Sequence, residues 1–238
     1  MGGLAIVVAL LAAAGGGDLA GRTVVIDPGH NGRNGANPQR INRQVDIGNG
    51  MRKACDTAGA QTASGYTESR YNLAVAREVA RILRRNGAEV ILTRRGDRGV
   101  GPCITRRAGI GNDAEADAAV SIHADGGPSG GRGFHVIRPT RIEGLTDDIY
   151  ASSRRLGRIM RAAYGKRTGL PRATYVGGNG LVARSDLGGL RLSDVPKVFV
   201  ETANLRNATD ASKVESPGFR KRIARGIADG LRQYLTAR

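Results

Sequence analysis

The stretch VVIDPGHNG, residues 24–32, decides the fold. Three β-branched residues lead to Asp27, and Pro28 and Gly29 then interrupt the extended chain. A short β-branched run that ends in this way is typical of a buried strand followed by a turn. His30 comes directly after the turn. It is therefore either an ordinary turn residue or part of a site at the carboxyl end of the strand.

The segments around this stretch predict an α/β domain. We expect a strand over 22–27, a helix over 68–86 with apolar residues at helical spacing, and a strand over 89–93. This β-α-β order indicates a parallel sheet. Residues 31–66 are polar and rich in Gly and Asn, which predicts a long excursion that carries at most a small hairpin. Further strands are expected at 118–123, 134–137 and 197–201, and further helices at 106–113, 148–168 and 219–235.

A chain of 238 residues suits one such domain. We predict a single α/β domain whose mostly parallel or mixed sheet of about five to six strands is flanked by helices.

The N-terminus has an apolar run over residues 4–14. A bilayer span needs about 20 residues, so this run predicts no stable membrane span. It fits the core of a secretory signal, and Ala12-Ala13-Ala14 fits a cleavage site, although the usual preceding basic residues are missing. We assign residues 1–17 to a signal-peptide-like or disordered segment and residues 18–238 to the folded domain. We expect an exported protein in the periplasm, in the cell wall or outside the cell.

The formal net charge of +16 indicates an anionic partner or an anionic environment. Nucleic acid is disfavoured as the partner, because the chain has only three Phe, six Tyr and no Trp to stack on bases. The basic residues are also spread along the whole chain. The cluster Arg220, Lys221, Arg222 and Arg225 is most simply the solvated face of the last helix.

Four polar residues stand at the ends of predicted elements. His30 and His123 end strands, Glu68 begins the first long helix, and Glu201 ends a further apolar strand, where a carboxylate is costly without a partner. Ligand sites in α/β sheets lie at the carboxyl ends of the strands, so these four side chains are candidates for one site.

Two histidines, one glutamate and a water form a familiar catalytic zinc set. The metal acidifies the water, and a nearby carboxylate such as Glu201 can take its proton. A histidine at a strand end is more often a turn or core residue, and the residues alone leave both interpretations open. His135 lies within a strand and points away from the side of Phe134, which favours a structural role or a substrate contact.

Cys55 and Cys103 are the only cysteines, and neither has zinc-finger spacing. Disulfides persist in exported proteins, so we expect a Cys55–Cys103 bridge, with two free thiols as the alternative.

Four segments together resemble a known family: VVIDPGHNG, TESRYNLAVAREVARILRRNGAEVILTR, AAVSIHADGG and VFVETANLRN. In order and spacing they are similar to the signature segments of the zinc-dependent N-acetylmuramoyl-L-alanine amidases of the AmiC type. The similarity covers most of residues 22–235. It extends to CITRRAGIGN, where Arg107 and Asn112 fit the family and Gly111 replaces an alanine.

The resemblance implies that His30, Glu68 and His123 bind Zn²⁺ and that Glu201 is the catalytic carboxylate. It implies hydrolysis of the amide bond between N-acetylmuramic acid and L-alanine in peptidoglycan. The long 31–66 excursion is similar to the actinobacterial, mycobacterial-type branch, which also carries a cysteine pair. The residues after Glu201, TANL, depart from the Gly or Pro that often follows in the family.

Two other functions remain as alternatives to this expectation. One is a zinc peptidase or amidase with another substrate, and the other is a non-catalytic module that binds cell wall or nucleic acid. The expected partner is peptidoglycan or its muropeptides, with no nucleic acid, and we expect a monomer.

Overall fold

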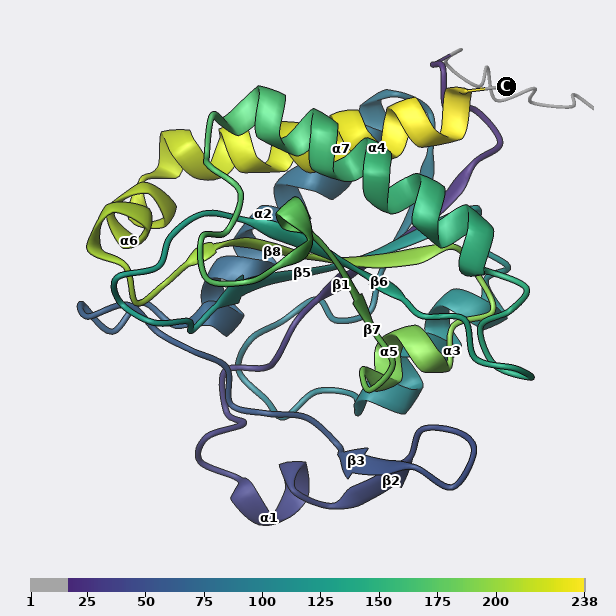
Figure 1. The fold of residues 1–238 in the computed structure, drawn as a ribbon, viewed down its shortest axis with the longest axis horizontal. Coiled ribbons are helices and arrows are strands. Elements are labelled where there is room, and N and C mark those ends of the chain that lie inside the picture. The colour runs from purple at the N-terminus through teal and green to yellow at the C-terminus, as the bar shows by residue number, and fades with distance from the viewer. Residues whose placement is uncertain (1–16, 238) are drawn as a thin grey trace, which may run out of the picture.

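A computed structural model describes residues 17–237 and shows a central sheet of six strands (Figure 1). The strand order is β4-β1-β5-β8-β6-β7. Neighbouring strands pair in parallel, except that β6 runs antiparallel to β8. The mixed, mostly parallel sheet confirms the predicted single α/β domain. The strands are β1 (Thr23–Pro28), β4 (Glu89–Leu92), β5 (Ala118–Asp125), β6 (His135–Pro139), β7 (Leu181–Arg184) and β8 (Lys197–Asn204).

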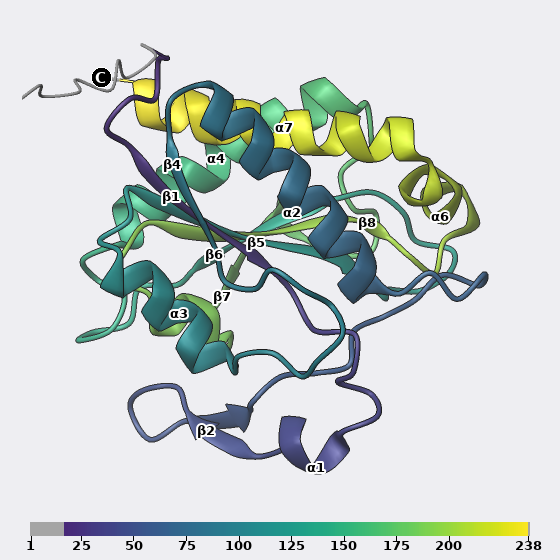
Figure 2. The ribbon, with the colours of Figure 1, turned by 180° about the vertical axis from the view of Figure 1, so that it is seen from behind.

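Helices cover both faces of the sheet (Figures 1 and 2). Three long helices share one face: α2 (Glu68–Arg85), α4 (Tyr150–Thr168) and α7 (Pro217–Thr236). The opposite face carries α3 (Ile104–Asp113) and the short α5 (Gly188–Arg191). No helix within residues 17–237 is long and apolar enough to cross a membrane.

Strand β1 explains how the core is divided between the two faces. Its apolar residues are fully buried because it pairs in parallel with β4 on one side and β5 on the other. Successive side chains of a strand point to opposite faces. Val24 and Ile26 accordingly join the large core under α2, α4 and α7, whereas Val25 joins a smaller cluster with Ala119 and Val195 on the other face.

The excursion between β1 and α2 contains α1 (Pro38–Ile41) and a small antiparallel hairpin, as predicted. The hairpin strands are β2 (Gln44–Asp46) and β3 (Arg52–Ala54), and they lie below α3 and α5 in the view of Figure 1. Arg191 of α5 ties the hairpin to the domain by donating hydrogen bonds to the carbonyl oxygens of Ile47 and Gly48.

A disulfide between Cys55 and Cys103 forms a second tie, with 4.6 Å between the two Cα atoms, and it confirms the predicted bridge. It joins the end of the hairpin to the N-terminus of α3. In the loop-entropy model, closing a loop of this length lowers the conformational entropy of the unfolded chain and so stabilises the folded protein by roughly 4 kcal/mol.

The long predicted elements are found within a few residues of their expected bounds. The structure also contains several short elements, of which the sequence predicted only the hairpin β2–β3; the edge strand β7 and four short helices were not predicted. The short helices outside the prediction are α1, η1 (Gly178–Gly180), α5 and α6 (Ala208–Glu215). The predicted signal-like segment, residues 1–17, lies outside the described residues except for Gly17.

Candidate active site

The turn after β1 holds His30 in a strained backbone conformation. His30 has a φ of 59°, in the left-handed region that costs a non-glycine residue of order 1 kcal/mol. Arg107 of α3 fixes the turn by donating hydrogen bonds to the carbonyl oxygens of Pro28 (2.8 Å) and His30 (3.1 Å). Gly29 is needed for close approach, because a Cβ there would lie 2.1 Å from the ring of His123.

Asp27 lies below the turn at the centre of a buried polar network. Its carboxylate accepts hydrogen bonds from Ser121 and Thr93 at 2.6 Å each and from Arg107 at 2.8 Å. Burial alone would raise the pKa of the Asp27 carboxyl. The cations of Arg107 and Lys197 outweigh burial and hold this pKa well below its usual value of 3.8. Asp27 therefore stays ionised and fixes the turn, and it is not among the side chains that could hold a metal.

We expect the Arg107→Met variant to be less stable than the parent protein by about 3–5 kcal/mol. The substitution leaves two buried carboxylates, Asp27 and Asp56, without their guanidinium partner. The neighbouring Arg106→Met change is the matched control, because the Arg106–Asp113 pair is exposed and should be worth less than about 1 kcal/mol. Urea unfolding of the three proteins measures both effects. Equal losses in the two variants would contradict the assigned role of the network.

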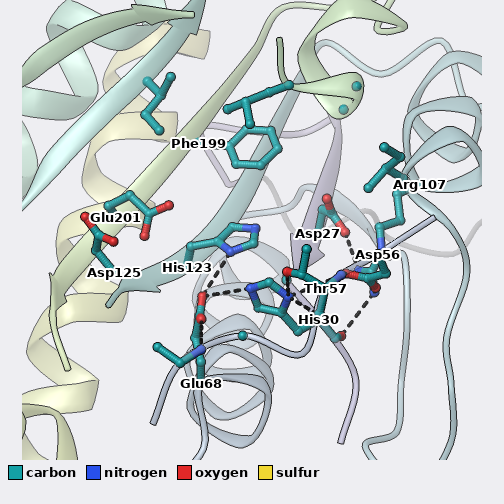
Figure 3. Close-up of a pocket in the computed structure, with 18 of the residues that line it drawn as sticks. Asp27, His30, Asp56, Thr57, Glu68, Arg107, His123, Asp125, Phe199 and Glu201 are labelled. Atoms are coloured by element: carbon teal, nitrogen blue, oxygen red, sulfur yellow. Dashed lines mark hydrogen bonds and ion pairs between the residues drawn. The ribbon is translucent and has the colours of Figure 1, made fainter. Parts of the chain in front are cut away.

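Three of the predicted site residues meet at the carboxyl edge of the sheet (Figure 3). His30, Glu68 and His123 each offer one ligand atom, and these atoms all lie within 4.8 Å of one another. The Oε1 atom of Glu68 is 3.1 Å from His30 Nε2 and 3.0 Å from His123 Nδ1. The backbone N–H groups of Ala60 and Ala124 donate to the carboxylate of Glu68 and fix its orientation.

This group fits a zinc ion. Ligand atoms about 2.0–2.2 Å from a tetrahedral zinc lie roughly 3.4 Å apart, which is close to the spacing between Glu68 and the two rings. Two imidazoles and one carboxylate also leave a fourth position for water or substrate, as in catalytic zinc sites.

The surroundings of His30 and Glu68 favour a bound cation. The Nδ1 atom of His30 lies 3.1 Å from the Thr57 carbonyl oxygen and 3.4 Å from the Asp56 carboxylate, contacts that orient a metal-binding histidine. Burial disfavours the charged imidazole, but Glu68 and Asp56 outweigh burial and raise the pKa of His30 to about 10. Burial likewise opposes ionisation of Glu68, yet the two histidines hold its pKa well below 4.5. The carboxylate is thus ionised, as a metal ligand must be.

Glu201 enters the same pocket from β8, where it pairs in register with His123 on one side and His135 on the other. Figure 3 shows Glu201 beside Asp125, on the far side of His123 from His30. Burial, followed by the charges of Glu68 and Asp125, raises the pKa of Glu201 well above 4.5. Its buried Oε2 atom has no hydrogen-bond partner within residues 17–237. Such an oxygen is suited to a group that comes from outside the chain.

The walls of the pocket include residues that the sequence did not single out. The cavity has a volume of about 400 Å³, and one wall is formed by the chain that leaves the hairpin. The ring of Phe199 stacks on His123, with 5.2 Å between the centroids. An ion pair between Lys53 and Asp186 (3.2 Å) joins the hairpin to the loop after β7. Phe199 could have been found from the sequence, because it is two residues before Glu201 and therefore on the same face of β8.

His135 is buried but is neither in the group that could bind a metal nor in the lining of this pocket. Its ring meets that of Tyr175 edge to face, with 6.3 Å between the centroids. The sequence left a structural role and a substrate contact open for His135, and this packing favours the structural role.

Comparisons with known proteins identify relatives along nearly the whole chain. The model of the Amidase_3 family, described as N-acetylmuramoyl-L-alanine amidase, matches residues 24–233. The N-acetylmuramoyl-L-alanine amidase Rv3717 of Mycobacterium tuberculosis is 38% identical over 92% of this chain and 88% of its own length.

Two crystal structures from mycobacteria share the fold. The N-acetylmuramyl-L-alanine amidase Ami1 of Mycobacterium smegmatis is 37% identical, with a TM-score of 0.86 over 92% of this chain and 99% of that one. The apo form of Ami1 from Mycobacterium abscessus is 42% identical, with a TM-score of 0.85 over 91% of this chain and 100% of that one. These matches confirm the resemblance found in the sequence.

Proposed function

The chain belongs to the Amidase_3 family of N-acetylmuramoyl-L-alanine amidases, and we propose that it cleaves its peptidoglycan substrate with a zinc ion held by His30, Glu68 and His123. The bond cleaved is the amide between N-acetylmuramic acid and L-alanine. The observation that carries the proposal is that one ligand atom from each of these three side chains lies within 4.8 Å of the others, beside Glu201, whose buried Oε2 atom is unpaired within residues 17–237.

Zinc, when bound, polarises the scissile carbonyl and lowers the pKa of a water molecule. Glu201 accepts the proton of the attacking water through its free Oε2 atom and then delivers it to the departing amine of L-alanine. The products are the lactyl carboxylate on the glycan and a stem peptide with a free amino terminus. The raised pKa of Glu201 makes its carboxylate a stronger base. A divalent cation nearby would lower this pKa again, because it favours the ionised carboxylate.

The ring and backbone contacts around the pocket keep these groups in place. Asp56 and Thr57 orient His30, Phe199 supports His123, and the backbone amides hold Glu68. A site held on strand ends and a helix start needs little rearrangement when substrate binds.

Incubation with a defined muramyl-peptide should release an intact stem peptide that begins with L-alanine, and a strong chelator should stop the reaction. Activity should stop because the chelator removes the group that polarises the carbonyl, and it should return when zinc is added back. Mass spectrometry of the products measures the position of cleavage. Cleavage inside the stem peptide would indicate a zinc peptidase instead. Binding without turnover would indicate a non-catalytic wall module.

We also propose that the protein is exported and acts at the cell wall as a monomer. Its relatives include cell-wall amidases, and residues 1–17 are proposed as the export signal. Met51 is the only large hydrophobic side chain exposed within residues 17–237, so this part of the chain offers no extended apolar surface for a stable dimer.

A further inference from the structure

A second and larger groove lies on the outer side of α2, separate from the metal-binding group. Its volume is about 1060 Å³. Its lining comes from the chain before α2, from α2 itself and from the loop after β4, and the end of α6 and the start of α7 close one end. The two hollows are neighbours along the chain, because Thr57, Gly59 and Ala60 line the active-site pocket and residues 64–66 line this groove.

Five arginines line the groove, and within residues 17–237 none of them forms an ion pair with a carboxylate. They are Arg70, Arg77, Arg95, Arg98 and Arg220. The two acidic residues of the lining are already engaged, because Asp97 pairs with Arg94 and Glu215 accepts hydrogen bonds from Thr62 and Ser64. The groove therefore presents a strong excess of positive charge to solvent.

Contacts with the protein hold three of these guanidinium groups in place. Arg70 and Arg220 both lie over the ring of Tyr66, each 5.5 Å from its centroid. Arg220 also donates to the carbonyl oxygens of Val214 and Glu215, and Arg77 donates to that of Arg95 at 2.7 Å. Each guanidinium has five N–H donors, so donors remain for a ligand, and ordering the side chains in advance reduces the entropy lost on binding.

The layout fits an extended ligand with repeated oxyanions. Arg70 and Arg77 are seven residues apart on one helix face, which separates them by roughly 10 Å along the axis. A single phosphate cannot reach both, but a flexible chain of phosphates can. The planar guanidinium group of an arginine can donate two parallel hydrogen bonds to two oxygens of one phosphate. Leu73 and Ala74 are the only aliphatic side chains of the lining. Its one aromatic ring, that of Tyr66, is already in contact with Arg70 and Arg220, and these contacts compete with the stacking of a nucleic-acid base.

We propose that this groove binds a linear, phosphodiester-linked anionic polymer of the cell wall and so keeps the enzyme beside its glycan substrate. The inference goes beyond the proposed hydrolysis and does not depend on zinc or Glu201. It gives part of the net charge of +16 a local role, whereas the sequence alone favoured a solvated basic surface.

Binding of a synthetic glycerol-phosphate oligomer to the full chain tests the proposal. The groove variant carries Arg70→Gln, Arg77→Gln and Arg98→Gln. The control variant carries Arg154→Gln, Arg158→Gln and Lys166→Gln, three exposed positions on α4. Both variants remove three positive charges. We expect the groove variant to bind about 10- to 100-fold more weakly than the parent, with a reduced dependence on salt, and the control to change affinity by less than about threefold.

Equal weakening in both variants would overturn the proposal, because it would show general attraction to a basic surface. Poly-glutamate of matched charge and single-stranded DNA are the other probes. If the groove binds poly-glutamate more tightly than the glycerol-phosphate oligomer, its ligand is a peptide rich in carboxylates. If it binds single-stranded DNA more tightly, its ligand is a nucleic acid. Turnover of a small muramyl-peptide, measured on the same proteins, reports separately on the proposed hydrolysis. If the groove variant also loses this turnover, its substitutions on α2 have disturbed the active site. A second variant, Arg95→Gln with Arg98→Gln, leaves α2 unchanged and must then bind the oligomer more weakly than the parent; if it binds equally well, the proposal is wrong.

Discussion

Replacing His30 with asparagine is expected to remove both zinc and amidase activity and to leave the fold in place. His30 is one of three proposed ligands, so its loss should weaken zinc binding by more than the roughly 10–100-fold typical of an outer-shell partner. Asparagine suits the test because it tolerates the left-handed backbone that His30 adopts, with its φ of 59°. The turn is also held by Arg107 through backbone oxygens, and the substitution leaves these in place.

Metal content after equilibrium dialysis, circular dichroism and turnover of a muramyl-peptide measure the three parts of this prediction. His135→Gln is the matched control, because it removes a buried histidine of the sheet that is not among the proposed ligands. It should keep zinc even if it lowers stability. A His30 variant that retains stoichiometric zinc would refute the assigned ligand set.

The sequence predicted those parts of the fold that carry a regular pattern. The buried β1 run and the face of α2 repeat apolar residues at strand and helix spacing, and both elements lie within one or two residues of their expected bounds. The edge strand β7 was missed because two of its four residues are partly buried, two are exposed, and the strand follows a Gly-rich turn. The short α5 was missed for a similar reason, since its buried positions result from packing against the hairpin and β8 and not from a periodic pattern.

The same distinction applies to the site. His30, Glu68, His123 and Glu201 could be selected because each ends or begins an element, and parallel strands bring such ends to one edge. Asp56 could not be selected, because it lies in the irregular excursion far from His30 in sequence. Two tertiary contacts place it: the disulfide of its neighbour Cys55, and the ion pair with Arg107. The arginine groove was missed because its side chains come from separate segments that only the fold brings together.

Replacing Glu201 with glutamine is expected to lower kcat by about 10²- to 10⁴-fold while zinc remains bound. The amide has nearly the same shape as the carboxylate but cannot accept the proton of the attacking water. The fold should tolerate the change, because the desolvation of Glu201 and the charges of Glu68 and Asp125 already disfavour its carboxylate form. Stability should therefore be equal to or slightly higher than that of the parent protein.

Single-turnover kinetics, metal content and thermal unfolding of the Glu201 variant check these expectations together. Asp125→Asn supplies the control, since it neutralises another carboxylate of the same pocket and should retain activity within about tenfold. The Glu201 and His30 variants then separate two roles that activity alone cannot distinguish. Loss of turnover with zinc still bound assigns proton transfer to Glu201, whereas joint loss of zinc and turnover assigns metal binding to His30. If the Glu201 variant cleaves muramyl-peptide at the parent rate, another group must accept the proton. The unpaired Oε2 atom would then have to be explained by a role in holding substrate or water.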